Sequence, residues 1–223
     1  MDHDEGDPMT ELFELRQYTL HPGRRDELIA LFDNEFVESQ AEAGMRVYGQ
    51  FRDLDDPDRF VWIRGFPDAS RRAESLAAFY ERHPAWLAHR EAANATMMDS
   101  DDVLLLTPVT GDLDAARASP PARAGGDGAA GFEIVICHPE DPDAFPELFR
   151  REVLPALAEA GAPPLASFRT SAHPNDYPRL PVREGEQVFV WLSRSAAPAG
   201  LLPAGSRPPQ RLRLAPTPRS WLR

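Results

Sequence analysis

The sequence contains no lysine, and all 24 of its basic residues are arginine. This absence excludes mechanisms in which a lysine amine acts as a base or forms a Schiff base. It is typical of a chain encoded by a GC-rich bacterial genome. The formal net charge of −12 repels phosphate backbones, and no arginine-rich run with interleaved aromatic residues occurs, so we expect no nucleic-acid partner.

Long apolar runs and paired cysteines are also missing. No segment approaches the roughly 20 apolar residues that span a bilayer, so we expect no membrane partner. The single cysteine, Cys137, cannot form an internal disulfide, and no Cys/His spacing typical of structural zinc occurs, so we expect no metal. Residues 1–10 are acidic and lack the features of a secretory signal, which indicates a disordered lead on a cytoplasmic protein.

An internal repeat is the most informative feature that the sequence does contain. Residues 21–52 align without a gap on residues 138–169, at an offset of 117, and 12 of the 32 positions are identical. The match resumes where Phe60-Val61-Trp62 pairs with residues 189–191. Such self-similarity indicates a duplicated unit. We expect a first half over 11–110, a linker over 111–130 and a second, degenerate half over 131–223.

Each half is expected to fold in the order β-α-β-β-α-β. In the first half the pattern predicts strands at 12–20, 46–52, 59–65 and 103–109, and helices at 24–43, 69–82 and 85–97. In the second half it predicts strands at 131–137, 165–171, 187–193 and 211–215, and a helix at 142–160. The second half has a loop twelve residues longer before its third strand, and its Pro- and Gly-rich segment 195–209 replaces the second helix.

Three segments, LFELRQYTLHPG (12–23), VWIRGF (61–66) and FYERHPAW (79–86), resemble NIPSNAP proteins of the dimeric α/β barrel superfamily. The resemblance implies an α+β fold in which two ferredoxin-like repeats, the second lacking most of its second helix, form a pseudo-dimer within one chain. Two chains could pair further as a homodimer. Relatives include cofactor-free monooxygenases, haem proteins and isomerases, so the fold alone does not give the function.

Alternation along the strands places polar and aromatic side chains on one face of the sheet, and we expect this face to line the barrel interior. There, arginines could bind a carboxylate and a tyrosine could donate a proton. The alternative interpretation is an ion-pair network that docks the two halves, for example between Arg16 and Glu133. The candidate catalytic residues are Tyr18, Arg16 and His89, and the candidate substrate-binding residues are Glu14, Tyr48, Gln50, Trp62, Arg64, Glu133 and Trp191.

These candidates favour a protein that binds a small organic molecule in the barrel cavity and could transform it, without a nucleotide cofactor, in specialised metabolism. Whether the chain is an enzyme is left open. A non-catalytic binding or interaction module is the first alternative, and a haem protein that uses His89 or His21 is the second. The second half has Gly131, Glu133 and Val135 at the places of Glu14, Arg16 and Tyr18, which puts a symmetric second site in doubt.

Overall fold

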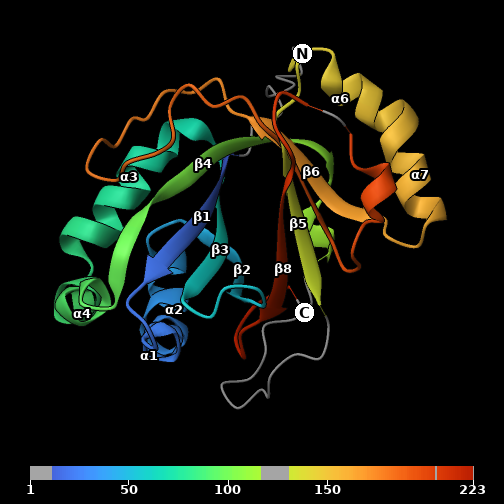
Figure 1. Ribbon diagram of the computed structural model, residues 1–223. Coiled ribbons are helices and arrows are strands. Elements are labelled where there is room, and N and C mark those ends of the chain that lie inside the picture. Colours follow the sequence, from blue (N-terminus) through green and yellow to red (C-terminus); the bar gives the residue numbers. More distant parts are fainter. Residues whose placement is uncertain (1–11, 117–130, 204, 223) are drawn as a thin grey trace, which may run out of the picture.

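The computed structural model describes residues 12–116, 131–203 and 205–222 (Figure 1). The expected disordered lead, residues 1–10, lies outside them, as do residues 117–130 of the expected linker. Within the described ranges no helix is both long enough and apolar enough to cross a bilayer.

The first half forms a four-stranded sheet whose strands stand in the order β4-β1-β3-β2. They are β1 (Leu12–Leu20), β2 (Arg46–Asp53), β3 (Arg59–Phe66) and β4 (Met97–Gly111). Strand β4 begins six residues before its predicted start, and the helix before it, α4 (Pro84–Asn94), ends before residue 97. Thr96 accounts for the difference, because its hydroxyl donates a hydrogen bond to the Ala93 carbonyl and ends the helix.

Helices cover one face of this sheet. Helix α1 (Arg25–Leu31) continues through a π-helical turn, Phe32–Phe36, into α2 (Val37–Glu42). Helix α3 (Arg72–Ala77) ends in a second π-helical turn, Ala78–Arg82, and α4 (Pro84–Asn94) follows. Gly44 adopts a left-handed conformation (φ 87°) after the first helix, where a residue with a Cβ would be strained.

The second half repeats this plan in reduced form, with strand order β8-β5-β7-β6. Its elements are β5 (Phe132–Cys137), α6 (Phe145–Leu148), a π-helical turn (Phe149–Val153), α7 (Leu154–Glu159), β6 (Pro164–Thr170), β7 (Phe189–Ser193) and β8 (Gln210–Pro216). The described residues between β7 and β8 hold one short 3₁₀ turn, Ala199–Leu201, in place of a second helix, which confirms that prediction. A short helix, α5 (Leu113–Ala116), lies within the expected linker.

The two sheets close into one barrel of eight antiparallel strands. Strand β2 pairs with β8, and β4 pairs with β6. Both edge strands of the first sheet are therefore hydrogen-bonded to the edge strands of the second sheet. Figure 1 shows the helices of each half on opposite outer sides of this barrel. The chain is therefore the intramolecular pseudo-dimer that the resemblance implied.

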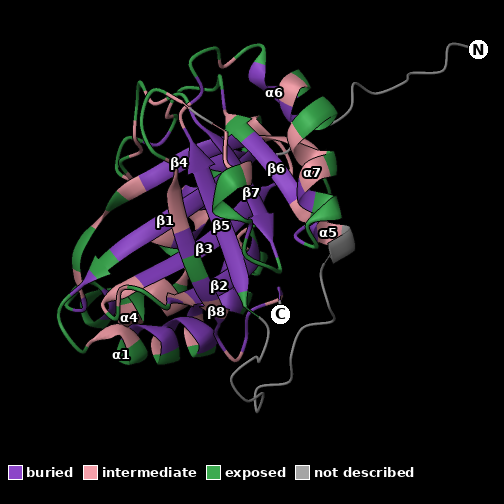
Figure 2. Ribbon diagram, turned by 45° about the vertical axis from the view of Figure 1, so that its right-hand side comes forward, coloured by how far each residue is buried: buried purple, intermediate pink, exposed green. Residues whose placement is uncertain are grey.

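Apolar side chains fill the barrel interior. Phe13 packs against Phe168 with ring centroids 5.0 Å apart, and Phe51 packs against Phe132 at 5.4 Å. The cluster continues through inward-facing residues of all eight strands. Most strand residues are buried (Figure 2), although β4 is buried only at residues 103–106. The expectation that the polar face of β1 lines this interior is wrong. The alternation was identified correctly, but Phe13 and Leu15 point inward, so Glu14, Arg16 and Tyr18 face the helices.

Candidate functional site

A buried charge cluster lies on the helix-facing side of the first sheet. The Glu14 carboxylate accepts hydrogen bonds from Arg16 Nη1 at 2.7 Å, Arg64 Nε at 2.7 Å and Arg72 Nε at 2.8 Å. Glu14 and Arg16 lie on β1, and Arg64 lies on β3. Glu14 and Arg64 meet because they stand opposite each other in the antiparallel register. All four side chains are at most 1% exposed.

The electrostatics of this cluster keep its members charged. Burial alone would raise the pKa of Glu14, but Arg64, Arg16 and Arg72 outweigh that effect and hold it far below its ordinary value. Burial would likewise lower the pKa of Arg16, and the neighbouring Tyr18 and Glu14 raise it instead. One carboxylate thus faces three guanidinium groups, which leaves an excess of positive charge in a buried place.

Beside this cluster, a pocket of about 370 Å³ opens between the sheet and the helices. Its deep walls are aromatic and come from β1, β3 and the two π-helical turns of the first half. Its mouth is bordered by α4, the start of β4 and a loop of the second half. The lining residues are Arg16, Tyr18, Leu28, Phe32, Phe36, Gln40, Trp62, Phe79, Tyr80, Trp86, Arg90, Asn94, Met97, Ser100, Tyr177, Arg179 and Leu180.

Tyr18 and Arg16 lie together at the floor of the pocket. The Tyr18 hydroxyl oxygen accepts a hydrogen bond from Arg16 Nε at 3.0 Å. Burial raises the pKa of Tyr18 despite the nearby Arg16, so the hydroxyl keeps its proton at neutral pH. Within the described part of the chain no acceptor takes that proton. The phenol can therefore donate it to an atom in the pocket.

Trp62 also lines the pocket and carries a further buried donor. Its ring lies 5.5 Å from the Arg16 guanidinium carbon and 5.0 Å from that of Arg64. Its indole Nε1 is buried and has no hydrogen-bond partner among the described residues. A buried donor without a partner costs about 1–3 kcal/mol, and such a cost at a pocket wall is relieved when a ligand supplies an acceptor.

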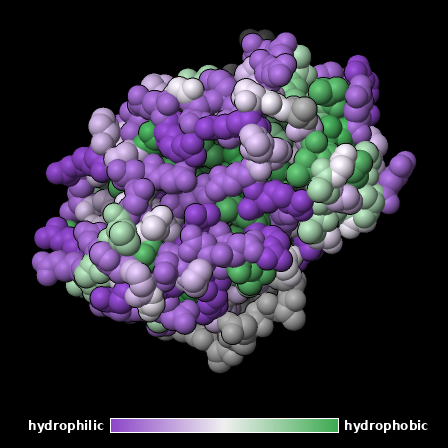
Figure 3. All heavy atoms as spheres, in the orientation of Figure 1, coloured by the Kyte–Doolittle hydropathy of each residue, from purple (hydrophilic) through white to green (hydrophobic). Residues whose placement is uncertain are grey.

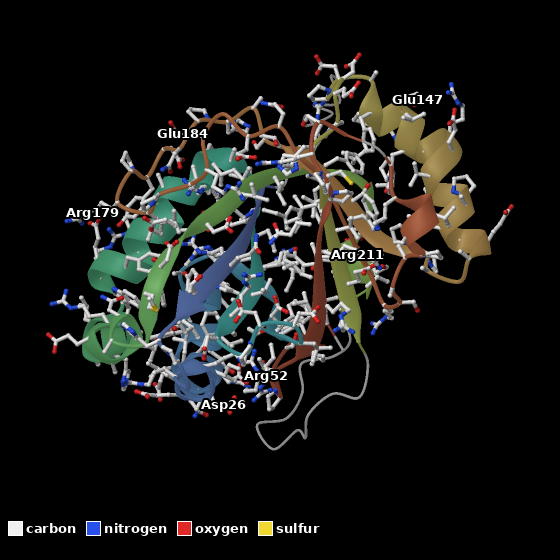
Figure 4. All side chains as sticks on the ribbon, viewed as in Figure 1. Asp26, Arg52, Glu147, Arg179, Glu184 and Arg211 are labelled. Atoms are coloured by element: carbon white, nitrogen blue, oxygen red, sulfur yellow. The ribbon has the colours of Figure 1, made fainter. Side chains whose placement is uncertain are left out.

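The long loop that joins β6 to β7, residues 171–188, crosses over α3 of the first half (Figure 1). Arg72 donates hydrogen bonds to Asn175 at 3.1 Å and to Asp176. The Tyr177 hydroxyl donates to Glu81 at 2.8 Å, and Arg179, which Figure 4 labels at the outer side of the loop, donates to the same carboxylate at 2.9 Å. The lengthened loop of the second half thus contributes Tyr177, Arg179 and Leu180 to the wall of the first half's pocket.

The corresponding face of the second half differs in its chemistry. Glu133 replaces Arg16 and accepts hydrogen bonds from Arg211 (Figure 4) and from the Ala197 backbone, while Val135 replaces Tyr18 in an apolar cluster. Trp191, the counterpart of Trp62, is buried in that cluster. Apolar residues also gather on the surface around α6 and α7 (Figure 3), on the side where the second helix is missing.

Of the predicted site residues, the structure brings five together: Glu14, Arg16, Tyr18, Trp62 and Arg64. The others lie elsewhere. Tyr48 lies in the barrel core, where its hydroxyl donates to Asp114, and Gln50 donates to Asp33 at 3.2 Å. Glu133 and Trp191 belong to the outer face of the second half.

The docking alternative is corrected in one respect. Arg16 pairs with Glu14 of its own strand, and Glu133 pairs with Arg211, so the expected Arg16–Glu133 ion pair is wrong. A buried arginine does tie the halves together, but it is Arg72, which the sequence did not single out.

The histidines considered as haem ligands lie away from the pocket lining. His89 Nε2 is 3.7 Å from a Glu35 carboxylate oxygen, and the side chain is 39% exposed. His21 stands at the exposed turn after β1. Among the described residues no group of three or more His, Cys, Asp or Glu side chains is arranged to hold a metal ion.

Sequence reasoning missed the outer wall of the pocket. Phe79, Tyr80 and Trp86 belong to the segment FYERHPAW, whose aromatic density was a usable signal. Tyr177 and Arg179 lie in the lengthened loop of the second half. No spacing rule places a loop from one repeat over the helices of the other.

Comparison with known proteins finds a family match within the first half of the chain and solved structures that resemble most of its length. Residues 13–110 match the NIPSNAP family model. No curated protein matches the sequence.

Two solved structures resemble nearly the whole chain. A candidate monooxygenase from Lactobacillus acidophilus has a TM-score of 0.55 and 15% identity, over 93% of this chain and 94% of that one. A candidate monooxygenase from Fusobacterium nucleatum has a TM-score of 0.58 and 8% identity, over 93% of both chains. A NIPSNAP family protein of unknown function from Agrobacterium tumefaciens has a TM-score of 0.41 and 21% identity, over 46% of this chain and 91% of that one. At these identities the full-length likenesses establish the fold and nothing further.

Proposed function

We propose that this chain, whose first half is a NIPSNAP domain, binds a small organic molecule with a flat apolar body in the pocket between β1, β3 and the helices of that half. The observation that carries the proposal is the composition of the pocket. An aromatic enclosure of about 370 Å³ is lined by Arg16, Tyr18 and Trp62, and the Trp62 N–H has no hydrogen-bond partner among the described residues. Ligand pockets of this size are typically apolar with a few convergent polar groups.

The walls favour a flat ligand. Phe32 and Trp62 meet edge to face with centroids 4.9 Å apart, as do Tyr80 and Trp86 at 4.8 Å. Such rings offer both faces and edges to a planar guest, and each aromatic contact contributes about 0.5–1.5 kcal/mol beyond the area it buries. The candidate monooxygenases of the same full-length fold are consistent with a small-molecule ligand.

The polar side chains at the floor of the pocket, Arg16 and Tyr18, provide hydrogen-bond donors for the ligand. Tyr18 would donate its proton, through a hydrogen bond, to a carbonyl or phenolic oxygen of the ligand, and Arg16 would stabilise negative charge that develops on that oxygen. These groups act without a nucleotide cofactor. Arg16 is held by Glu14, and Glu14 by two further arginines, so the donors are oriented before the ligand arrives.

A blocking variant tests this function. Ser100 lines the pocket mouth, whereas Met98, two residues away on β4, is 61% exposed and lies outside the lining. We expect Ser100→Trp to abolish binding of planar aromatic compounds that carry a carbonyl or phenol, and Met98→Trp, the matched control, to preserve it. Quenching of the fluorescence of Trp62 and Trp86 reports binding. Equal affinities in both variants would place binding outside this pocket.

A variant of the floor tests the role of the hydroxyl. Tyr18→Phe removes the donor and leaves the ring, so the affinity for an oxygen-bearing ligand should fall about 2- to 13-fold, the loss expected for one hydrogen bond of about 0.5–1.5 kcal/mol. The affinity for the parent hydrocarbon should not change. An equal loss for both compounds would assign Tyr18 a packing role only.

A further inference from the structure

The polar groups at the floor of the pocket are donors, and this restricts the class of ligand. Arg16 is permanently protonated, Tyr18 accepts from Arg16 and has its proton free, and Trp62 offers an N–H alone. The Gln40 amide is already hydrogen-bonded within the protein. Its nitrogen donates to the Phe36 carbonyl, and its oxygen accepts from Arg64 at 3.1 Å. A ligand that satisfies this floor must bring acceptors.

The balance of charges in the buried cluster also favours a ligand that brings acceptors. Arg16, Arg64 and Arg72 share one buried carboxylate, Glu14. Asp176, the second acid at the cluster, pairs with Arg72 and is 35% exposed. Two guanidinium groups therefore share Glu14 without a second acid, and an uncompensated buried charge is costly.

The mouth of the pocket also carries an excess of positive charge. Arg90 and Arg179 border it, and no aspartate or glutamate is among the described residues that line the pocket. Arg179 is partly neutralised by Glu81. A lining that holds three arginines and no acid is unusual in a chain of formal net charge −12. Elsewhere the acidic surface would repel an anion, whereas at this mouth it meets cations.

Building on the proposed function, we infer that the ligand is an organic anion, a planar molecule whose carboxylate or ionised enol lies on Arg16, Tyr18 and Trp62 while its apolar body lies between the aromatic walls. Two oxygens of a carboxylate can accept from a guanidinium and a phenol together. The bound anion supplies the charge that the three arginines lack and the acceptor that the Trp62 N–H lacks.

Two probes of nearly equal shape separate charge from shape. 2-Naphthoate carries a carboxylate, and 2-naphthamide replaces it with a neutral amide. Isothermal titration calorimetry at pH 7.5 with both probes should give the wild-type protein at least a tenfold lower Kd for 2-naphthoate. In Arg16→Met, which keeps an unbranched apolar stem and removes the guanidinium charge, the preference should fall below threefold. Should this variant fail to fold, the wild-type ratio decides by itself.

The outcomes distinguish this inference from the proposed function beneath it. If both probes bind equally well and both are lost in Ser100→Trp, the pocket binds planar molecules and the anionic class is overturned. If neither probe binds the wild-type protein, or both bind Ser100→Trp as well as Met98→Trp, the proposed function fails and the inference fails with it. A tenfold preference that survives unchanged in Arg16→Met places the anion elsewhere and overturns the assignment to this floor.

Discussion

Replacing Glu14 by glutamine should destabilise the folded chain more than any surface substitution, because it leaves three buried arginines without their shared carboxylate. Removing one partner of a buried ion pair costs about 3–5 kcal/mol. Glutamine keeps one acceptor oxygen, so we expect about 3 kcal/mol. For a chain of this size that corresponds to a decrease in Tm of about 6–12 °C.

The pH dependence gives this prediction a second, independent signature. The folded-state pKa of Glu14 is depressed, so its contribution is complete above the unfolded-state pKa and is lost as pH falls below it. The stability difference between wild type and Glu14→Gln should therefore be constant at neutral pH. Below a pH of about 4.3 it should shrink by about 1.4 kcal/mol per pH unit.

Urea denaturation at pH 7.0 and pH 3.5, monitored by tryptophan fluorescence, measures both quantities. Glu27→Gln is the control, since Glu27 forms an exposed pair with Arg24 and its loss should not be detectable. A difference below about 1 kcal/mol at pH 7.0, or one that stays the same at pH 3.5, would refute the assignment of Glu14 as the ionised centre of the cluster.

Three other predictions concern the loop, the barrel and the thiol. Tyr177→Phe removes the hydrogen bond from the loop to Glu81, so ligand dissociation measured by stopped-flow fluorescence should accelerate about 2- to 13-fold; an unchanged rate would mean that the loop does not close the pocket. Phe168→Ala, inside the barrel, should lower the free energy of unfolding by about 3–5 kcal/mol in urea, and a loss below 1 kcal/mol would contradict the packed interior. Burial raises the pKa of the Cys137 thiol to about 12, so mass spectrometry should find it unmodified by iodoacetamide at pH 8 until the chain unfolds.

The sequence was sufficient to predict the repeat, the strands and the missing helix. The identities between residues 21–52 and 138–169 fixed the two-fold plan, and proline and glycine in 195–209 correctly excluded a helix. These features are local, because turn chemistry and periodicity act within a few residues. The alternation of β1 was also predicted, since Phe13 and Leu15 belong to the barrel core and Tyr18 to the cluster under the helices.

The side of the sheet could not be predicted from that alternation. Phe13, Leu15, Glu14 and Arg16 alternate in either orientation, and the buried charges of this chain occupy the face where apolar residues meet helices in most sheets. The cluster is tolerated there because the Glu14 carboxylate pairs with arginines of its own strand, of the neighbouring strand β3 and of helix α3. Pairing between segments 50 residues apart is invisible to a pattern read along the chain.

The wall supplied by the second half was missed for a related reason. The twelve extra residues were visible, but their destination depends on how the two sheets close, and that is decided by the β4–β6 and β2–β8 pairings. Tyr177 then reaches Glu81 across 96 positions of sequence. A lengthened loop is a usable signal in the sequence, since long ordered loops in compact folds commonly carry functional residues.

The β2–β8 and β4–β6 pairings, which join the two halves, lie within one chain, and this affects how the barrel behaves at low protein concentration. A barrel assembled from two separate chains dissociates on dilution, because the association of its halves depends on the concentration of free chains. Here β2 and β4 meet β8 and β6 of the same polypeptide, so the second half is held at a fixed and high local concentration. Because the loop that walls the pocket belongs to that tethered half, a single molecule carries a complete site at any dilution.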